Sequence, residues 1–364
     1  MAYVELQLRV SNNAQVVATR QGGAEATGTF RLTQLHQDLI AVLDRWVRGN
    51  KITRREEMNA LGSLLYETIF DGPVAQLFNK SLDEIESPDR LRLQLIFDRD
   101  AFALASIPWE FLYRPDHTHS AGYFFATHPR LVLSRYMPLE EDREDLQAVD
   151  GPLRFLVVVA KPKELGPVLE TAVVEEIEKL CAESGFGFRK LDNPPIEDFV
   201  RQLEEYKPHL LHFMGHGHYK PSEDQGELAL LKPDRETVEW VTDATFATYF
   251  ESAKPRLVVL HACEGGQIDF TSKFAGLAPK LIRQYIPAVV AMQYEVSNKT
   301  AIKFSKMFYK LLADREPIDG AVQQSRRQLT IGDPNAYSNR DFGTPVLYMR
   351  SRDGLIMPSI RPNG

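Results

Sequence analysis

Short apolar runs alternate with segments of helical periodicity from residue 154 onward. The runs at 155–160, 209–214, 257–262 and 288–292 are rich in aliphatic residues. Continuous runs of this length are typical of strands that are buried on both faces of a parallel sheet. Strands that alternate with helices therefore predict an α/β fold, in which helices cover both faces of a mostly parallel sheet.

The N-terminal part of the chain follows a different pattern and predicts an α+β domain. Residues 3–10 alternate with period two, as a half-buried strand does, and residues 29–32 are expected to be its hairpin partner. Helical spacing follows at 33–48 and 53–70.

An acidic segment that ends in Gly151 and Pro152 separates the two patterns. A change of composition of this kind is typical of a linker. We therefore expect one domain at 1–150 and a second domain at 151–364.

The composition limits the classes of partner. A formal net charge of −7 and a pI near 5.8 argue against nucleic acid as the main partner. No apolar run approaches the roughly 18–20 residues that span a bilayer, so no membrane is expected. The first residues lack the pattern of a signal peptide, and two cysteines make no disulfide framework. The sequence therefore predicts a cytoplasmic protein.

The two cysteines stand in different contexts. Cys181 shares the apolar face of a predicted helix with Val173 and Ile177, where it is expected to fill the core. Cys263 follows the run at 257–262 directly and precedes two glycines. Parallel sheets place their chemistry just past the carboxyl ends of their strands, so Cys263 is the cysteine that needs a functional explanation.

The run at 209–214 ends in a similar way, with His216 between Gly215 and Gly217. We interpret Cys263 and His216 as a nucleophile and its base, which neighbouring parallel strands bring together. A cysteine attacks as the thiolate, so an adjacent imidazole must lower its pKa and take its proton. The backbone N–H groups of Gly217 and Cys263 are the expected oxyanion donors.

Three other histidines compete with His216 for the role of base. His212 lies inside the strand, where a core role is favoured, and His218 is placed to contact substrate. His261 precedes Cys263 by two residues and shares its face of the strand, so it is a candidate for lining the substrate pocket. A zinc site built from His216, His218, His261 and Cys263 is an alternative, although the spacing matches no common zinc pattern.

Phosphate-binding signatures do not occur in the sequence. No GxxxxGK[ST] motif is present, and no GxGxxG follows the first strand of the predicted sheet. A nucleotide-binding regulatory domain is therefore supported only by analogy with other doubly wound sheets. His–Cys chemistry needs no metal and no organic cofactor, and neither is expected.

Several segments resemble the CHAT family, a caspase-like branch of the cysteine peptidases that includes separase-like enzymes. They are LLHFMGHGHY at 210–219, VVLHACEGG at 258–266, AVVAMQYEVSNKTAIKFSKMFYKLL at 288–312 and FGTPVLYMRSRDG at 342–354. The resemblance implies a caspase-like six-stranded sheet whose last strand is antiparallel, and it assigns the dyad to His216 and Cys263. Segments within 91–138 resemble the region that commonly precedes the catalytic part of this family.

The chain departs from the family pattern at Glu295, where a proline is common. The resemblance places the loop after the 288–292 strand beside the pocket for the residue before the scissile bond, so an acidic residue there favours Arg or Lys in the substrate. Glu264, Asp269 and Asp224 are further acidic candidates at the same edge. Small or apolar side chains are the alternative preference, because surface carboxylates are usually only solvated.

The residues and the resemblance together predict a cysteine endopeptidase that cleaves a specific protein substrate, in bacterial defence or signalling. Many members of the family carry repeats or sensor domains that control the protease, and none is recognised in this sequence. A regulatory protein partner or the N-terminal domain is therefore expected to control it. The rival interpretation is a catalytically silent interaction module that keeps the sheet and recognises a partner.

Overall fold

The structure is a computed structural model that describes residues 2–11, 14–116, 121–137, 146, 149, 151–166, 168, 170–220, 225–262 and 272–357. The chain divides into two compact units, Met1–Met137 with Val322–Thr344, and Pro138–Ala321 with Pro345–Gly364. The division passes through helix α9 (Ile318–Thr330). The expected boundary at residue 150 stays a prediction about domains, and each unit is described by itself.

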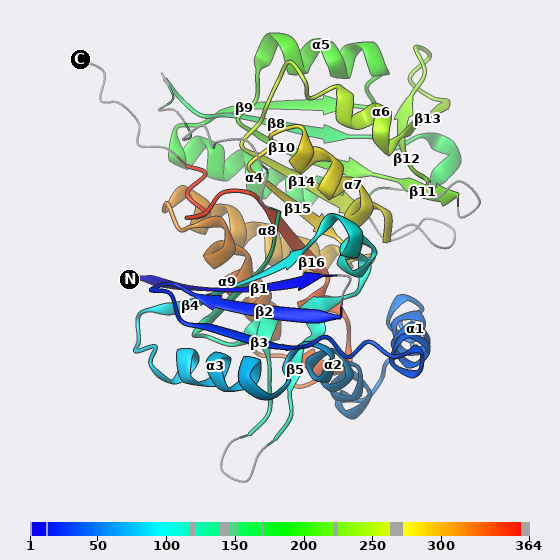
Figure 1. Ribbon diagram of the computed structural model, residues 1–364. Helices are drawn as coiled ribbons and strands as arrows, with labels where there is room; N and C mark the ends of the chain where they lie inside the picture. The colour runs from blue at the N-terminus through cyan, green and yellow to red at the C-terminus, as the bar shows by residue number, and fades with distance from the viewer. Residues whose placement is uncertain are drawn as a thin grey trace. The chain divides into compact units, whose positions relative to one another are not determined.

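The first unit contains strands in the order β3-β2-β1-β4-β7, of which β1 to β4 are labelled in Figure 1. β1 and β4 are parallel, as are β4 and β7, whereas β2 is antiparallel to both of its neighbours. The strands are β1 (Tyr3–Ser11), β2 (Gln15–Arg20), β3 (Glu25–Thr29), β4 (Arg90–Phe97) and β7 (Leu131–Tyr136).

The hairpin partner that the sequence predicted for β1 is wrong. β2, and not residues 29–32, pairs with β1. This pairing sets Val16 opposite Val10 and Ala18 opposite Leu8, and all four side chains are buried. The burial of these two cross-strand pairs explains the choice of partner.

Three helices accompany this sheet. They are α1 (Gln34–Arg48), α2 (Arg55–Ile69) and α3 (Gly72–Asp83), and a short hairpin, β5 (Tyr113–Arg114) with β6 (Tyr123–Phe124), follows later in the chain. α1 and α2 confirm the two predicted helices, and α3 was not anticipated. α3 contacts β3 closely, because a Cβ on Gly28 would lie only 2.9 Å from Val74 Cγ2.

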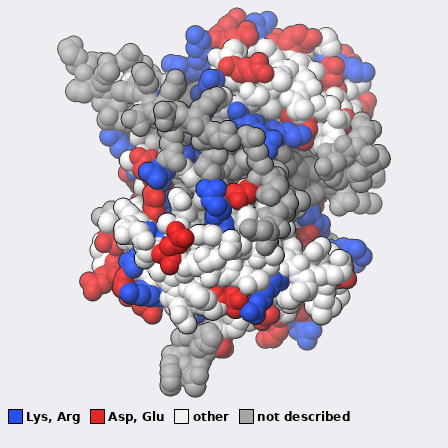
Figure 2. Space-filling model, viewed as in Figure 1, with Lys and Arg blue, Asp and Glu red and all other residues white. Residues whose placement is uncertain are grey.

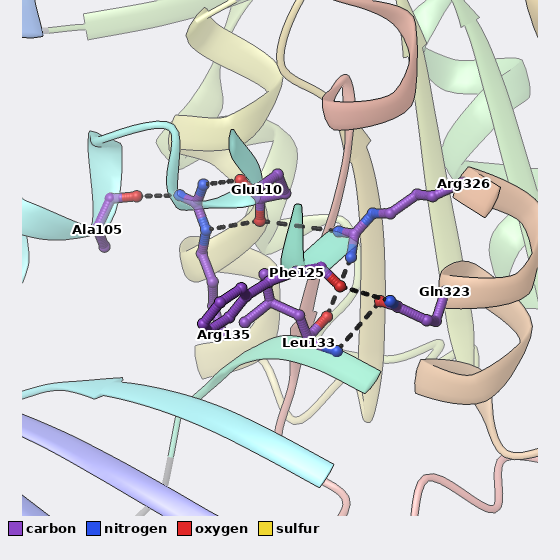
Figure 3. Close-up of polar contacts among 7 residues, drawn as sticks. All are labelled: Ala105, Glu110, Phe125, Leu133, Arg135, Gln323 and Arg326. Carbon is purple, nitrogen blue, oxygen red and sulfur yellow. Dashed lines mark hydrogen bonds and ion pairs between the residues drawn. The ribbon is translucent and has the colours of Figure 1, made fainter. Parts of the chain in front are cut away.

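A buried ionic cluster in the first unit centres on Glu110, whose carboxylate faces two arginines (Figure 3). Arg135 donates from Nη2 to Glu110 Oε2 at 2.5 Å and from Nε to Oε1 at 3.2 Å. Arg326 Nη2 lies 3.7 Å from Oε1, and burial lowers the pKa of Arg326 to about 10. Each arginine also donates to a carbonyl oxygen, Arg135 to that of Ala105 and Arg326 to that of Leu133.

Residues 322–344 belong to the first unit. Gln323 and Arg326 of α9 contact this unit beside the Glu110 cluster. Gln323 Nε2 donates to two carbonyl oxygens in segment 125–128, at 2.7 and 3.2 Å, and its Oε1 accepts from Leu133 N at 3.3 Å. Arg326 Nη1 donates to Leu133 O at 3.1 Å. Side chains of α9 therefore form hydrogen bonds with both the N–H group and the carbonyl oxygen of Leu133 in β7 (Figure 3).

The second unit contains strands in the order β16-β15-β14-β10-β8-β9 (Figure 1). Every neighbouring pair is parallel except β15 with β16. The strands are β8 (Arg154–Val159), β9 (Gly187–Asp192), β10 (Leu210–Gly215), β14 (Leu257–Ala262), β15 (Ala288–Met292) and β16 (Pro345–Met349). The expected arrangement of six strands with the last one antiparallel is confirmed.

Helices cover both faces of this second sheet. His212 and Phe213 follow each other in β10 and so point to opposite faces. His212 contacts Tyr309 of α8, whereas Phe213 packs edge-on against Phe246 of α6, and Phe246 stacks on Phe199 of α5. The helices are α4 (Thr171–Ser184), α5 (Ile196–Tyr206), α6 (Asp243–Thr248), α7 (Ser272–Arg283) and α8 (Asn298–Ala313).

A small antiparallel sheet in the order β11-β12-β13 follows β10 in the chain. Its strands are β11 (Gly217–Lys220), β12 (Gln225–Leu231) and β13 (Val238–Thr242). β12 and β13 form a hairpin, and β11, which was not predicted from the sequence, begins directly after His216. The polypeptide that leaves β10 is therefore fixed by a second ladder.

Candidate active site

The ends of β10 and β14 lie next to each other at the carboxyl edge of the second sheet. Gly215, the last residue of β10, pairs with Ala262, the last residue of β14. His216 follows Gly215 and so lies at this edge. Cys263 follows Ala262 in the sequence, but it lies outside the described residues.

His216 is buried, with 4% of its surface exposed, and its Nε2 lies 3.3 Å from the carbonyl oxygen of Gly166. A carbonyl oxygen only accepts hydrogen bonds, so Nε2 carries the hydrogen and Nδ1 of the neutral ring is an acceptor. Burial lowers the pKa of His216, and the hydrogen bond to Gly166 opposes this effect in part. At neutral pH the imidazole is therefore an uncharged base.

Gly166 lies in the loop after β8, directly after the short 3-10 turn η4 (Lys163–Leu165). Its φ of 85° and ψ of 177° form a combination that is essentially restricted to glycine. Glu164 Oε2 accepts from Val238 N at 3.4 Å and ties this loop to β13. Gly166 was not among the site residues predicted from the sequence, although a Gly-Pro pair soon after the end of a strand is a turn signal at the same edge.

Gly215 allows two strands to end close together. A Cβ on Gly215 would lie 3.1 Å from the carbonyl oxygen of Ala160 and 3.1 Å from Phe213 Cε1. Both separations are tighter than ordinary contacts, so a larger residue would push the end of β10 away from the end of β8. Gly215 therefore determines where the backbone of His216 lies at the end of β10.

Gly217, the expected oxyanion donor, opens β11. Ala229 N donates to His216 O at 2.9 Å, and Gly217 pairs with Leu228 in the antiparallel register. In this pattern Gly217 and Leu228 form a non-hydrogen-bonded pair, so the N–H of Gly217 points away from β12. That direction suits a donor to an oxyanion, and the role stays a prediction.

His261, expected to line the pocket, lies in a buried chain of polar contacts. Its Nδ1 is 3.3 Å from His212 Nε2, and His212 Nδ1 is 2.8 Å from the hydroxyl of Tyr309. Burial raises the pKa of Tyr309 and lowers the pKa of both histidines, to about 4 for His261. Tyr309 then donates to His212, which in turn donates to His261. His212 is a satisfied core residue, and a pocket role for His261 stays a prediction.

The acidic candidates are placed only in part. Glu295 is half-buried and follows β15, the neighbour of β14, so it lies at the same edge of the sheet as His216. Asp224, Glu264 and Asp269 lie outside the described residues. Their roles, and that of Glu295, stay predictions.

No group of three or more His, Cys, Asp or Glu residues in the described part of the chain is placed to hold a metal ion. The zinc alternative also needs Cys263 and the side chain of His218, which the structure does not describe. Cys181 is buried in α4, as the sequence predicted, and burial raises the pKa of its thiol to about 12.

The family model of the CHAT domain matches residues 59–342, which is most of the chain. The chain belongs to the CHAT domain family. The match includes the ends of β10 and β14, and it also includes the Glu110 cluster of the first unit.

Comparison with solved structures finds similarity to a chain in the crystal structure of the Saccharomyces cerevisiae separase–securin complex. The TM-score is 0.48 and the sequence identity is 11%, over 96% of this CHAT protein and 30% of that chain. This CHAT protein thus spans less than a third of the length of that relative. No curated protein sequence matches it.

Among the described residues, no helix has the length and apolar character needed to cross a bilayer. Acidic and basic side chains are interspersed over the face shown in Figure 2. The interspersed charges on this face agree with the small net charge of the sequence.

Proposed function

We propose that this CHAT protein is a cysteine endopeptidase with a dyad of His216 and Cys263. The observation that carries the proposal is the pairing of Gly215 with Ala262, the residues that immediately precede the two members of the dyad. Neighbouring strands lie about 4.8 Å apart and consecutive Cα atoms about 3.8 Å apart. His216 and Cys263 each follow one member of this cross-strand pair by a single peptide bond. The connectivity of the chain therefore keeps the two residues near each other.

The described half of the site supports a base at His216. With Nε2 bonded to Gly166, Nδ1 is the atom that takes the proton of the Cys263 thiol. The thiolate attacks the scissile carbonyl, and the N–H groups of Gly217 and Cys263 stabilise the oxyanion. The imidazolium then protonates the leaving amine, and water hydrolyses the thioester.

The acidic residues at this edge favour a substrate with Arg or Lys before the scissile bond. Glu295 is the described member of this set, and its half-buried position beside the end of β15 supports the preference. Replacement by Gln would remove the charge while keeping the size. The rival preference, for small or apolar side chains, predicts that E295Q leaves the ratio of Arg to Ala cleavage unchanged.

The biological setting follows only from the family. We propose a cytoplasmic protease that acts on a specific protein, under the control of a regulatory partner, in bacterial defence or signalling. A catalytically silent interaction module is the competing function, since a family member can keep the sheet without the chemistry.

Reaction with two electrophilic peptides, peptidyl acyloxymethyl ketones with Arg or with Ala next to the reactive group, separates these two functions under either substrate preference. Cys263 should react much faster than an unstructured cysteine, because His216 supplies the thiolate. His216→Ala should slow labelling by roughly 10²–10⁴-fold. Intact-mass spectrometry over time measures the rates.

The second cysteine provides a matched control. Cys181→Ala should leave labelling unchanged, because the raised pKa of the buried thiol keeps it unreactive, whereas Cys263→Ala should abolish labelling with little change in melting temperature. Labelling of Cys263 at the rate of a free cysteine would favour the silent module. Collapse of the fold in Cys263→Ala would make the cysteine structural.

A further inference from the structure

Helix α1 carries a row of exposed apolar side chains along one side. Leu35, Leu39, Val42 and Trp46 are 65%, 41%, 44% and 42% exposed. Only three other large apolar side chains are exposed among the described residues, and they are scattered in the sequence. Single exposed apolar residues are ordinary, whereas a continuous row marks an interaction surface. We call these four residues the α1 stripe.

The helix that carries the α1 stripe is held at both ends. Thr33 caps its N-terminus by accepting a backbone N–H of the first turn, and Arg340 donates to the carbonyl oxygens of Val47 and Arg48 at its C-terminus. Ile40 and Val47, on another side of the helix, are buried in the first unit. The stripe is therefore a preformed surface, and little conformational entropy is lost when it binds.

The spacing of the α1 stripe is symmetric. Its members are separated by four, three and four residues, which is the spacing with which one helix packs along another at a shallow angle. The same order of intervals results from reading the helix backwards. In an antiparallel pair with a two-fold axis between residues 40 and 41, Leu35 faces Trp46 of the other copy and Leu39 faces Val42.

The charges beside the stripe select the same arrangement. Asp38 and Arg45 are exposed, seven residues apart, on the same flank of the stripe. Neither forms an ion pair with another described residue of its own chain. In the antiparallel pair, Asp38 of each copy lies beside Arg45 of the other, whereas a parallel pair sets this flank against the opposite one and the two charges do not meet.

A lipid surface fits the helix less well. Helices that lie in a membrane interface carry a polar face rich in Lys and Arg. α1 instead has two acidic residues, Asp38 and Asp44, and two basic residues, Arg45 and Arg48. This balance of charge favours a protein surface that carries both signs.

From the self-complementary spacing and charges we propose that the chain dimerises through α1, as an antiparallel helix pair about a two-fold axis. The interface rests on four apolar side chains per copy, which is small beside the roughly 1,200–2,000 Å² of a standard stable interface. The dimer is therefore weak, and its dissociation constant lies in the micromolar range. It does not depend on the peptidase activity proposed above.

Sedimentation velocity of the whole chain, over concentrations from low micromolar to a few hundred micromolar, tests the proposal. The wild type should pass from monomer to dimer, and Leu39→Asp in the central layer should remain monomeric throughout. Ile331→Asp is the matched control, since it removes an exposed apolar residue elsewhere in the first unit, and it should dimerise like the wild type.

Charge reversal tests the antiparallel register itself. Asp38→Arg and Arg45→Asp should each weaken the dimer by roughly 3- to 10-fold, because each creates two like-charge pairs. An equimolar mixture of the two variants should recover the lost affinity, since every pair is then opposite in sign. High salt should reduce the differences.

Three results would overturn the proposal. One is a wild type that stays monomeric at the highest concentration, whether or not α1 then binds anionic vesicles. Another is a dimer that Leu39→Asp leaves intact. The third is a mixture of the two charge variants that dimerises no better than either variant alone.

Discussion

The strand end at His216 and the cluster at Glu110 are both buried polar sites, and they differ in how fully their groups are bonded. Glu110 meets two guanidinium groups, and Arg135 and Arg326 each donate to a carbonyl oxygen as well. Within the described part of the chain, His216 has one side-chain hydrogen bond, from Nε2 to Gly166.

This difference separates a structural site from a candidate catalytic one. Buried charges are stable when hydrogen bonds and counter-charges surround them, and the Glu110 cluster meets that condition. A general base must instead keep an acceptor available for a proton, and Nδ1 of His216 remains one. Substitutions at the two sites should therefore fail in different ways.

The largest expected effect is on the stability of the first unit. Glu110→Ala removes the counter-charge from two buried arginines and should lower the free energy of unfolding by about 3–5 kcal/mol. Chemical denaturation, followed by intrinsic fluorescence, measures the loss. The matched control is Arg9→Ala, which breaks an exposed ion pair with Asp98 and should cost less than about 1 kcal/mol. Equal losses in both variants would show that the cluster is no more than a surface pair.

Local periodicity predicted the strands of the second sheet, whereas its six-stranded arrangement with an antiparallel last strand was expected from the resemblance to the CHAT family. Each buried strand is a continuous apolar run, and the pairing of β10 with β14 agrees with the hypothesis that neighbouring strands carry His216 and Cys263. The dyad hypothesis placed His216 at a strand end from two glycines and a run, which are also local signals. What lies past Ala262 falls outside the described residues, so the cysteine half of that hypothesis stays a prediction.

The contacts that could not be predicted from the sequence join residues that are far apart in the chain. Nothing near Glu110 indicates that Arg326 will lie beside it, and nothing near His216 points to the carbonyl of Gly166. The hairpin partner of β1 was misassigned for a related reason, since burial of Val16 decided it rather than the composition of the turn. Tertiary packing chooses among local options that the periodicity leaves equal.

The chain of His261, His212 and Tyr309 predicts a dependence of stability on pH. Burial holds the pKa of His261 at about 4, below the 6.5 of an exposed histidine. Its contribution to stability is therefore complete above pH 6.5 and is lost as the pH falls toward 4, by roughly 3 kcal/mol. His261→Gln keeps a partner for His212 and cannot titrate, so its stability should fall less over this window. Thermal unfolding of the wild type and of His261→Gln between pH 7 and pH 4 gives the two melting temperatures as a function of pH. The same dependence on pH in both proteins would contradict the prediction.

The smallest expected effect is on the pKa of His216 itself. Gly166→Ala places a Cβ in a glycine-only conformation, which costs about 1–3 kcal/mol. Any shift of this peptide weakens the hydrogen bond that raises the pKa of His216, so that pKa should fall further. Titration of the imidazole by NMR measures the change. Gly185→Ala, at a left-handed helix end, is the control that should lower stability and leave the pKa of His216 unchanged. A loss of stability in Gly166→Ala with no change in that pKa would mean that the carbonyl of Gly166 does not orient the base.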